Sequence, residues 1–420
     1  MDGTTRQNQR ARPRRGSRLD RWLRARVLAR LDGMQGGRLR VDDPDGVHGV
    51  GVSGPLDCRV EVSDLRFWRM LATGGGLGAG EAYVAGLWET DDLVGVIRLL
   101  ARNRNLLVAL DGGPARLSGW LLRFWHRLNR NSLDGSRANI SAHYDLGNPF
   151  FAQWLDSRMI YSSAVYSSPD ESLDHAQARK LRLVCNKLEL GPDDHLLEVG
   201  TGWGGLAVFA AAEYGCRVTT TTISRAQYDW ACASVREAGL EDRITVLLKD
   251  YRELEGRFDK LVSIEMIEAV GHQYLDSWFT RLADLLRPDG LALIQAITIE
   301  DYRYRRALGT VDFIKRYIFP GSFIPSVSAI AASMARRTDF GLVDLEDIGA
   351  SYALTLNAWR RRFEDAWPRI REMGYDEAFR RRWNFYLAYC EGGFRERAIS
   401  DVQLLLARPE RGEVGRAAPS

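Results

Sequence analysis

The sequence contains few of the residues on which several common functions depend. It has five cysteines in 420 residues, without a CxxC pair, and six histidines, none at the spacing of a zinc ligand set. This usage predicts reduced thiols in a cytosolic protein and no metal site. No apolar run reaches the roughly 18–20 residues of a membrane span. Arginines interrupt the longest run, 93–110, and also stand where a signal peptide would be apolar.

Lysine is also scarce, since it occupies only five positions, whereas Lys and Arg together number 58. Acidic residues number 55, so the formal net charge is +3, which excludes a nucleic-acid binder that works through bulk charge. The charge is uneven, because residues 1–40 hold twelve arginines against three aspartates, a local net of +9 that leaves −6 for the remainder. Residues 1–17 lack apolar periodicity and are predicted to form a disordered basic tail.

From Arg18 onward the pattern becomes helical, because Leu19, Trp22, Val27 and Leu31 recur at helical spacing. A basic amphipathic helix of this kind can lie on an anionic membrane surface. It can equally pack its apolar side on its own domain and leave the arginines in water. The sequence alone leaves both interpretations open.

The rest of the chain reads as two domains. Residues 38–65 predict short strands, and 63–128 predict helices broken by a glycine loop at 74–78, so the first domain, 18–131, is predicted to be mainly helical. A polar stretch begins the second domain, 132–420. There, single helices alternate with strands, which predicts an α/β fold with a parallel, doubly wound sheet. The predicted strands are 195–199, 217–222, 244–248, 260–264 and 291–298, the last preceded by a turn at 288–290.

A glycine-rich loop follows the first of these strands and opens a helix. It reads Glu198-Val-Gly-Thr-Gly-Trp-Gly, with glycines at 200, 202 and 204. The spacing is G-x-G-x-G, no acidic residue ends the next strand, and no P-loop lysine is present, which together disfavour NAD and ATP. The loop resembles the first motif of class I S-adenosylmethionine-dependent methyltransferases. Ser224 and Gln227 are predicted to form a capping box on the following helix.

Several further segments occur in a distinctive order. They are HYDLGN at 143–148, MIYSSA at 159–164, TIS at 222–224, DYR at 250–252, EAVG at 268–271, YIFP at 317–320 and GGFR at 392–395. In the first domain, GLGAGEAY at 76–83 and GLWE at 86–89 belong to the same series. Together with the glycine loop, these segments resemble the cyclopropane-fatty-acyl-phospholipid synthases and mycolic-acid methyltransferases. The resemblance runs from about residue 60 to residue 405.

The resemblance implies a class I methyltransferase, Rossmann-like domain that binds S-adenosylmethionine, preceded by a domain for lipid handling and dimerisation. It implies cofactor contacts at Tyr161, Ser162, Glu198, Gly200, Gly202, Thr222, Gln227, Tyr251 and Arg252. It also implies an unsaturated phospholipid acyl chain as substrate, reached from the inner face of the membrane by a cytoplasmic, peripheral homodimer. A cyclopropane ring and a methylene-bearing chain are the alternative products, and the second would call for a reductase partner.

The chemistry explains why two products compete. Methyl transfer to an isolated alkene gives a carbocation, so the site must exclude water and present aromatic faces, for which Tyr161, Tyr317 and Phe319 are candidates. Loss of a proton from the transferred methyl group closes a cyclopropane ring. A hydride shift before that loss leaves a methylene group instead.

The family resemblance also implies a base, usually a bicarbonate held by a Cys backbone, a Glu, a His and a Tyr. Glu268 and Tyr317 match two of these holders, whereas Ser163 and Gln295 stand where Cys and His are common. Bicarbonate is therefore held differently here, or it is absent and Glu268 is the base itself. Glu265, three residues earlier, either pairs with Glu268 on one helical face or is a satisfied polar residue at a strand end.

Two further functions fit the sequence less well. A methyltransferase for a soluble small molecule would not need the first domain. A non-catalytic lipid-binding protein would not need the intact glycine loop, although Ser163 and Gln295 keep this alternative open.

Overall fold

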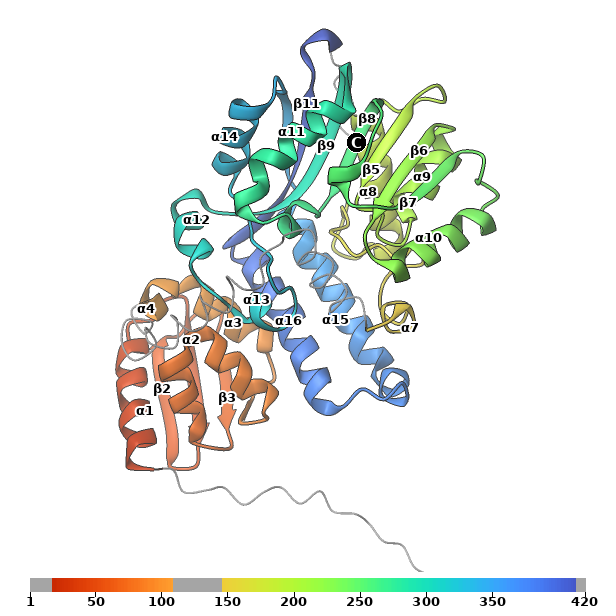
Figure 1. Cartoon of the computed structure of the whole chain (residues 1–420). Coiled ribbons are helices and arrows are strands. Elements are labelled where there is room, and N and C mark those ends of the chain that lie inside the picture. Colours follow the sequence, from red (N-terminus) through yellow and green to blue (C-terminus); the bar gives the residue numbers. More distant parts are fainter. Residues whose placement is uncertain (1–16, 109–145, 413–420) are drawn as a thin grey trace, which may run out of the picture. The chain divides into compact units, whose positions relative to one another are not determined.

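The computed structural model describes residues 17–108 and 146–412, and the chain divides into two compact units, Met1–Ser118 and Gly119–Ser420 (Figure 1). The predicted tail before Ser17, the predicted domain boundary after residue 131 and His143 lie outside the described residues. Within the two described stretches, no helix combines the length and apolarity needed to cross a bilayer.

The first unit contains a four-stranded sheet in the order β2-β1-β3-β4. Its elements are α1 (Arg18–Leu31), β1 (Gly37–Asp43), β2 (Gly46–Val52), β3 (Cys58–Val62), α2 (Arg66–Val84), β4 (Trp88–Glu89), α3 (Leu93–Arg102) and α4 (Arg104–Val108). Buried and exposed residues alternate along β1 and β3, so one sheet face lies in the core. The predicted strands are confirmed. The predicted loop at 74–78 is wrong, because α2 continues through it with a kink at Gly75, whose φ of 54° is accessible to glycine.

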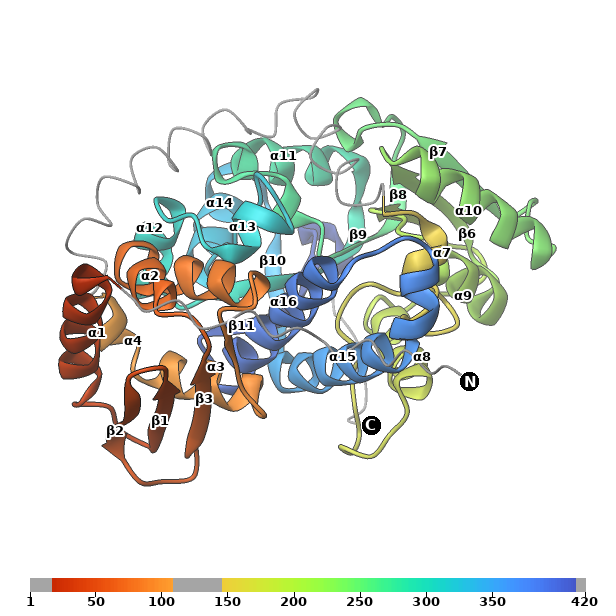
Figure 2. The same ribbon diagram turned by 90° about the horizontal axis from the view of Figure 1, so that it is seen from below.

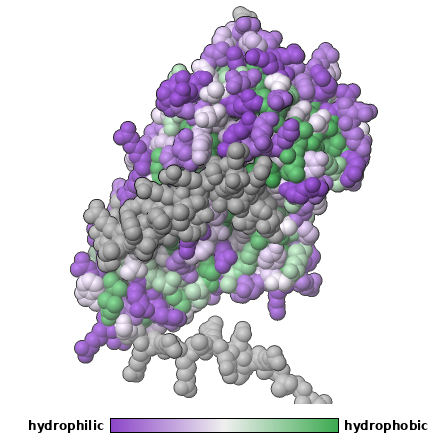
Figure 3. Space-filling model, in the orientation of Figure 1, coloured by the Kyte–Doolittle hydropathy of each residue, from purple (hydrophilic) through white to green (hydrophobic). Residues whose placement is uncertain are grey.

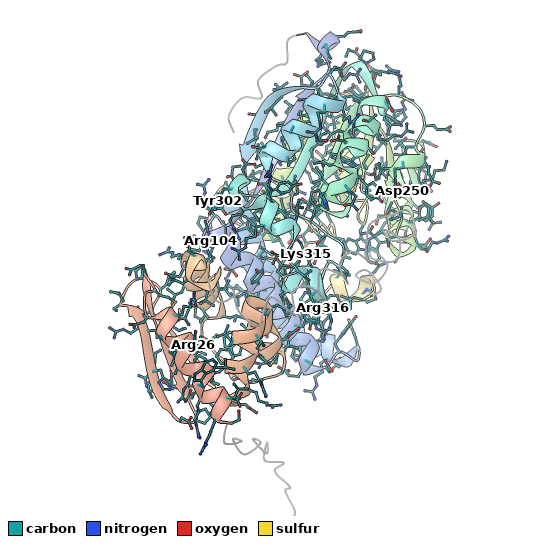
Figure 4. All side chains as sticks on the ribbon, turned by 60° about the vertical axis from the view of Figure 1, so that its left-hand side comes forward. Arg26, Arg104, Asp250, Tyr302, Lys315 and Arg316 are labelled. Carbon is teal, nitrogen blue, oxygen red and sulfur yellow. The ribbon has the colours of Figure 1, made fainter. Side chains whose placement is uncertain are left out.

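Helix α1 follows the predicted pattern only in part. Ser17 caps the helix, and Val27 and Leu31 are buried as expected. Leu19 and Trp22, however, are 51% and 55% exposed. The guanidinium of Arg26 lies 5.1 Å from the Trp22 ring centroid, and Figure 4 labels Arg26 on this helix. The helix therefore packs one side on its own unit and leaves apolar and basic side chains exposed on the other.

The second unit is built on a seven-stranded sheet in the order β10-β11-β9-β8-β5-β6-β7. The strands are β5 (His195–Val199), β6 (Arg217–Thr222), β7 (Ile244–Leu248), β8 (Phe258–Ile264), β9 (Leu286–Ile299), β10 (Gly341–Asp347) and β11 (Ile399–Ala407). All neighbouring pairs from β7 to β9 are parallel, and β11 is antiparallel to both β9 and β10. The predicted doubly wound α/β sheet is confirmed, and the strand order reverses between β5 and β8, since β6 and β7 lie on one side of this pair and β9 on the other.

Helices connect the strands of the second unit. Those of the second unit are α7 (Asn148–Phe151), α8 (Leu173–Lys187), α9 (Gly205–Tyr214), α10 (Arg225–Glu237), α11 (Leu275–Leu285), α12 (Asp301–Leu308), α13 (Phe313–Tyr317), α14 (Val327–Arg337), α15 (Gly349–Glu372) and α16 (Glu377–Arg395), with 3-10 turns η2 (Tyr251–Glu253), η3 (Ile267–Ala269), η4 (His272–Tyr274) and η5 (Pro409–Arg411). Helices α15 and α16 form a hairpin between β10 and β11, and they run side by side in Figure 2. On the face shown in Figure 3, the surface of this unit is largely hydrophilic.

One predicted turn differs from the structure. The segment 288–290 lies inside β9 rather than before it. Phe258 pairs with Leu286 and Lys260 with Leu291, so β9 advances five residues while β8 advances two. The extra residues of β9, which include Pro-Asp-Gly, form a bulge, and the strand continues beyond it. Residues after it return to register and lead β9 into the site.

Candidate active site

The site lies where the strand order reverses, at the carboxyl ends of β5 and β8. In open α/β sheets this is where ligands bind. The glycine loop follows β5 there, and Glu265 and Glu268 follow β8. Gln295 on β9 and Asp401 on β11 approach from the neighbouring strands. The fold thus gathers residues that lie far apart in the sequence.

The glycine loop is anchored to β6 and open on one side. The N–H groups of Gly200 and Thr201 both donate to the carbonyl of Thr221, at 3.1 and 3.0 Å. Gly202 has a φ of 53°, and a Cβ there would meet no atom within 4 Å. The space beside Gly202 fits a ligand that approaches the backbone closely.

Asn148 supports this loop from α7. Its Oδ1 accepts a hydrogen bond from the indole N–H of Trp203 at 2.8 Å, and its Nδ2 donates to the carbonyl of Ala226 at 3.3 Å. The side chain therefore joins the glycine loop to the start of α10. Asn148 was missed as a site residue, although it ends the HYDLGN segment.

Two further sequence-predicted pairs lie at neighbouring strand ends. Thr222 donates to Oε1 of Gln227 at 2.9 Å. Ser224 caps α10 as predicted, but the Gln227 side chain bonds Thr222 instead of completing a capping box. Beyond β7, Arg252 makes two 2.8 Å hydrogen bonds to the carboxylate of Asp250 and lies over the Tyr251 ring. Asp250, which caps η2, is labelled in Figure 4.

Tyr161 belongs to an aromatic cluster. Its hydroxyl is 2.8 Å from that of Tyr386, and its ring centroid lies 5.2 Å from Trp359 and 6.3 Å from Phe319. These rings supply the aromatic surface that the sequence predicted, with Trp359 and Tyr386 as members that it missed. The contacts described for Tyr317 are with Phe313, Arg316 and Arg382. Its place beside the acidic residues stays a prediction.

Glu198 and Ser162 each form a hydrogen bond with a neighbouring side chain close to the glycine loop. Glu198 is buried, accepts a 2.6 Å hydrogen bond from Thr220, and has its pKa raised to about 8 by burial. Ser162 accepts a 2.9 Å hydrogen bond from Nζ of Lys180. Both side chains are thereby engaged in supporting the loop and strand ends, so a direct cofactor contact stays a prediction for each.

The two carboxylate oxygens of Glu268 differ in their hydrogen bonding. Its Oε1 accepts a 2.6 Å hydrogen bond from the N–H of Ile297. Its Oε2 is buried and has no hydrogen-bond partner among the described residues. Burial first, and then the neighbouring Glu265, raise the pKa of Glu268 to about 8. A carboxyl group with a raised pKa and one oxygen without a partner is suited to act as a general base.

Glu265 is fully engaged. Its Oε1 accepts from the N–H of Ser163 and from Nε2 of Gln295, both at 2.8 Å, and its Oε2 accepts from the hydroxyl of Tyr352 at 2.6 Å. Its φ of 49° is not helical, so it does not share a helical face with Glu268. The reading of Glu265 as a satisfied polar residue at a strand end is confirmed.

These contacts bear on bicarbonate, which would have to accept the same hydrogen bonds. The N–H of Ser163 already donates to Glu265, and Nε2 of Gln295 donates to both Glu265 and Asp401, the latter at 2.9 Å. Burial raises the pKa of Asp401 well above its usual value, and Glu265 and Glu268 raise it further. The available donors are occupied and the surroundings are acidic, so a bicarbonate anion does not fit this arrangement.

One buried cation balances the acidic cluster. Lys180 is 1% exposed, and its charge acts on Glu265, Asp401 and Glu198, although burial lowers its pKa. Sequence reasoning missed Lys180, Tyr352 and Asp401 as site residues. Lysine is rare in this chain, but Lys249 is exposed, so rarity alone did not identify Lys180 as a site residue. Among the described residues, no group of His, Cys, Asp and Glu is arranged to hold a metal ion.

Comparison with known proteins decides the family. Residues 131–404 match the family model of mycolic acid cyclopropane synthetase. The chain is 37% identical over 351 residues to tuberculostearic acid methyltransferase UfaA1 of Mycobacterium tuberculosis, covering 81% of each protein. It is 36% identical over 362 residues to cyclopropane-fatty-acyl-phospholipid synthase of Escherichia coli K12, covering 86% of this chain and 90% of the relative. The chain belongs to the mycolic acid cyclopropane synthetase family.

A solved structure extends this result. The mycolic acid cyclopropane synthase CmaA1, complexed with SAH and CTAB, matches with a TM-score of 0.60 and 29% identity over 64% of this chain and 98% of that chain. As a member of the cyclopropane synthetase family with the class I fold, the chain is an S-adenosylmethionine-dependent methyltransferase. The predicted fold, enzyme class and cofactor are confirmed.

Proposed function

We propose that this enzyme transfers a methyl group from S-adenosylmethionine to the cis double bond of an unsaturated phospholipid acyl chain and closes a cyclopropane ring. Modification of lipid acyl chains agrees with the named relatives, which include a fatty-acyl-phospholipid synthase and a tuberculostearic acid methyltransferase. The observation that carries the proposal is the buried Oε2 of Glu268, which has no hydrogen-bond partner among the described residues, in a site whose neighbouring Glu265 accepts from Tyr352, 6.0 Å from the Trp359 ring of the aromatic cluster. This is what a site needs in order to stabilise a carbocation and then deprotonate it.

Each group of residues has a defined task in this proposal. S-adenosylmethionine supplies the electrophilic methyl group, and the opening at Gly202, with Thr222, Gln227, Tyr251 and Arg252, positions it. The faces of Tyr161 and Phe319 stabilise positive charge on the acyl chain and exclude water. Oε2 of Glu268 accepts the departing proton, while the electron pair of the broken C–H bond closes the ring.

A methylene-bearing chain is the second candidate product. It is supported by the 37% identity over 351 residues to a tuberculostearic acid methyltransferase. The methyl transfer and the base are the same, but a hydride shift precedes proton loss. A separate reductase would then convert the methylene group into a methyl branch.

Fatty-acid analysis distinguishes these products. The enzyme would be expressed in a bacterium that lacks its own synthase and is fed oleate, and the lipids examined by gas chromatography and mass spectrometry. We expect a chain one CH2 heavier than oleate with no double bond. The same mass gain with a C=CH2 group on the chain would establish the methylene product, and unchanged oleate would contradict both.

The raised pKa of Glu268 predicts a pH dependence. Only the ionised carboxylate accepts a proton, and its pKa lies near 8. We therefore expect kcat/KM to rise about tenfold per pH unit below this value and to level off above it, since kcat/KM reports the free enzyme. A flat profile between pH 6 and 9, roughly the interval spanning this pKa, would remove Glu268 from the role of base.

We also propose that α1 holds the enzyme on anionic membranes at the inner face of the cytoplasmic membrane. Its exposed side carries Trp22 and Leu19 among arginines, a combination that binds the interface through both apolar burial and charge. Vesicles with anionic lipid should bind more tightly than neutral ones, and salt should weaken the binding. The double substitution of Trp22 and Leu19 by Ala should reduce co-sedimentation about tenfold or more. Tyr302→Ala, which removes another exposed aromatic, is the control.

Dimerisation completes the proposal. The first domain is proposed to handle lipid and to form a homodimer, which light scattering of the purified protein would test. A monomer at micromolar concentration would contradict the dimer without affecting the proposed chemistry.

A further inference from the structure

We propose that Glu265 is a built-in replacement for bicarbonate, a fixed anion that occupies the oxyanion donors and frees the enzyme from dissolved bicarbonate. The inference rests on the proposed function and deepens it, because it concerns how the base is assembled. It follows from the hydrogen bonds of Glu265, because a bound bicarbonate would have to compete with this carboxylate for the same donors.

Three donors converge on this one side chain. The backbone N–H of Ser163, the amide of Gln295 and the hydroxyl of Tyr352 all donate to Glu265, at 2.6 to 2.8 Å. They come from a loop, from β9 and from α15, so no local motif explains their meeting. Such a set of donors is what a small oxyanion would use, and here a carboxylate fills it.

The surroundings explain why the anion is tolerated. Burial raises the pKa of Glu265, whereas its three hydrogen-bond donors and the charge of Lys180 favour the ionised form. Gln295 is fixed in turn by Asp401 and by Gln403, whose Nε2 lies 3.1 Å from Oε1 of Gln295. Glu265 makes no proton transfer in this account. It is a positioning residue that holds Ser163 and Gln295. The negative charge of Glu265 raises the pKa of Glu268 and so makes Glu268 a stronger base. The proton itself passes to Oε2 of Glu268.

The backbone at Glu265 makes a clean test available. Its φ of 49° lies in the left-handed region, which glycine adopts without a steric cost. Glu265→Gly therefore removes the carboxylate, leaves three convergent donors and relieves backbone strain, so the variant should fold. Glu189→Gly is a matched control, because Glu189 has a φ of 51° and precedes the amino end of β5, whereas the site lies at the carboxyl ends of the strands.

The experiment measures methyl transfer to oleoyl-phospholipid vesicles in CO2-depleted buffer, with and without added bicarbonate. Wild type and Glu189→Gly should change less than about twofold on addition. Glu265→Gly should lose about 100-fold in depleted buffer and regain at least about tenfold with bicarbonate, which refills the vacated donors. Glu265→Gln should lose activity without rescue, because its amide still fills the space.

The outcomes separate this inference from the proposed function. Wild-type activity that requires bicarbonate would overturn the inference and leave the methyl transfer standing. A folded Glu265→Gly variant that no concentration of bicarbonate improves would overturn it as well. Absence of wild-type activity under both conditions would instead contradict the proposed function. As a second readout, the rise of kcat/KM with pH in Glu265→Gly should shift to lower pH, because the charge that raises the pKa of Glu268 is gone.

Discussion

Glu268→Gln is expected to abolish turnover while leaving cofactor binding intact. The amide cannot accept a proton, and loss of a general base costs typically about 10²–10⁴-fold in rate. The Kd for S-adenosylmethionine, measured by calorimetry, should stay within about twofold, because the base acts on the acyl chain rather than on the cofactor. Glu213→Gln, on the exposed side of α9, is the control and should keep wild-type activity.

Stability should separate this loss from misfolding. The pKa of Glu268 is raised in the folded protein, so its contribution to stability is fully present below its unfolded pKa and is lost as pH rises through about 8. Replacement by neutral Gln should therefore leave the midpoint of thermal unfolding unchanged at about pH 4 and raise it increasingly between there and about pH 8. Retained turnover in Glu268→Gln, with normal cofactor binding, would require another group as base.

Of the substitutions proposed here, Lys180→Met is expected to lower the free energy of unfolding most. The substitution removes a buried cation whose charge favours the ionised forms of the carboxyl groups around it, which are Glu265, Asp156, Asp401 and Glu198. Removing one partner from a buried charged cluster costs about 3–5 kcal/mol in the free energy of unfolding. Urea unfolding should reveal this deficit at pH 8. The deficit should narrow toward pH 5, where the raised pKa values of the carboxyl groups favour their neutral forms.

Lys249→Met provides the control, because Lys249 is exposed. A surface lysine contributes about 0–1 kcal/mol through its ion pairs. A loss below about 1 kcal/mol for Lys180→Met would show that Lys180 does not balance the acidic cluster. Cofactor affinity should also fall in Lys180→Met, because the Ser162 hydroxyl loses the ammonium that anchors it.

Much of the fold followed from the sequence because local patterns determine it. Strands β5, β6 and β7 begin and end at the predicted residues, since short apolar runs between helices leave little freedom in a parallel sheet. The two glycine- and proline-rich breaks were wrong for a shared reason. Gly75 kinks α2 and residues 288–290 bulge within β9, because packing and pairing on both sides hold the element together.

The site was predictable only where family motifs run along the chain. Ser163, Gln295 and Glu268 were identified as candidates by resemblance, but the network around Glu265 joins groups 30 to 102 positions away from it. No periodicity reports such contacts. Tyr352 and Asp401 lie in an ordinary helix and strand, so nothing local distinguished them.

The most direct test of the account follows the methyl group itself. Purified enzyme would be incubated with S-adenosylmethionine carrying a CD3 group and with oleoyl-phospholipid vesicles, and the lipids analysed by mass spectrometry after separation of acyl chains from headgroups. The account predicts a CD2 unit added to the acyl chain, with the third deuteron lost to solvent through Glu268, and no labelled chain with Glu268→Gln. Label confined to the headgroup, or retained as an intact CD3 group on the chain, would contradict it.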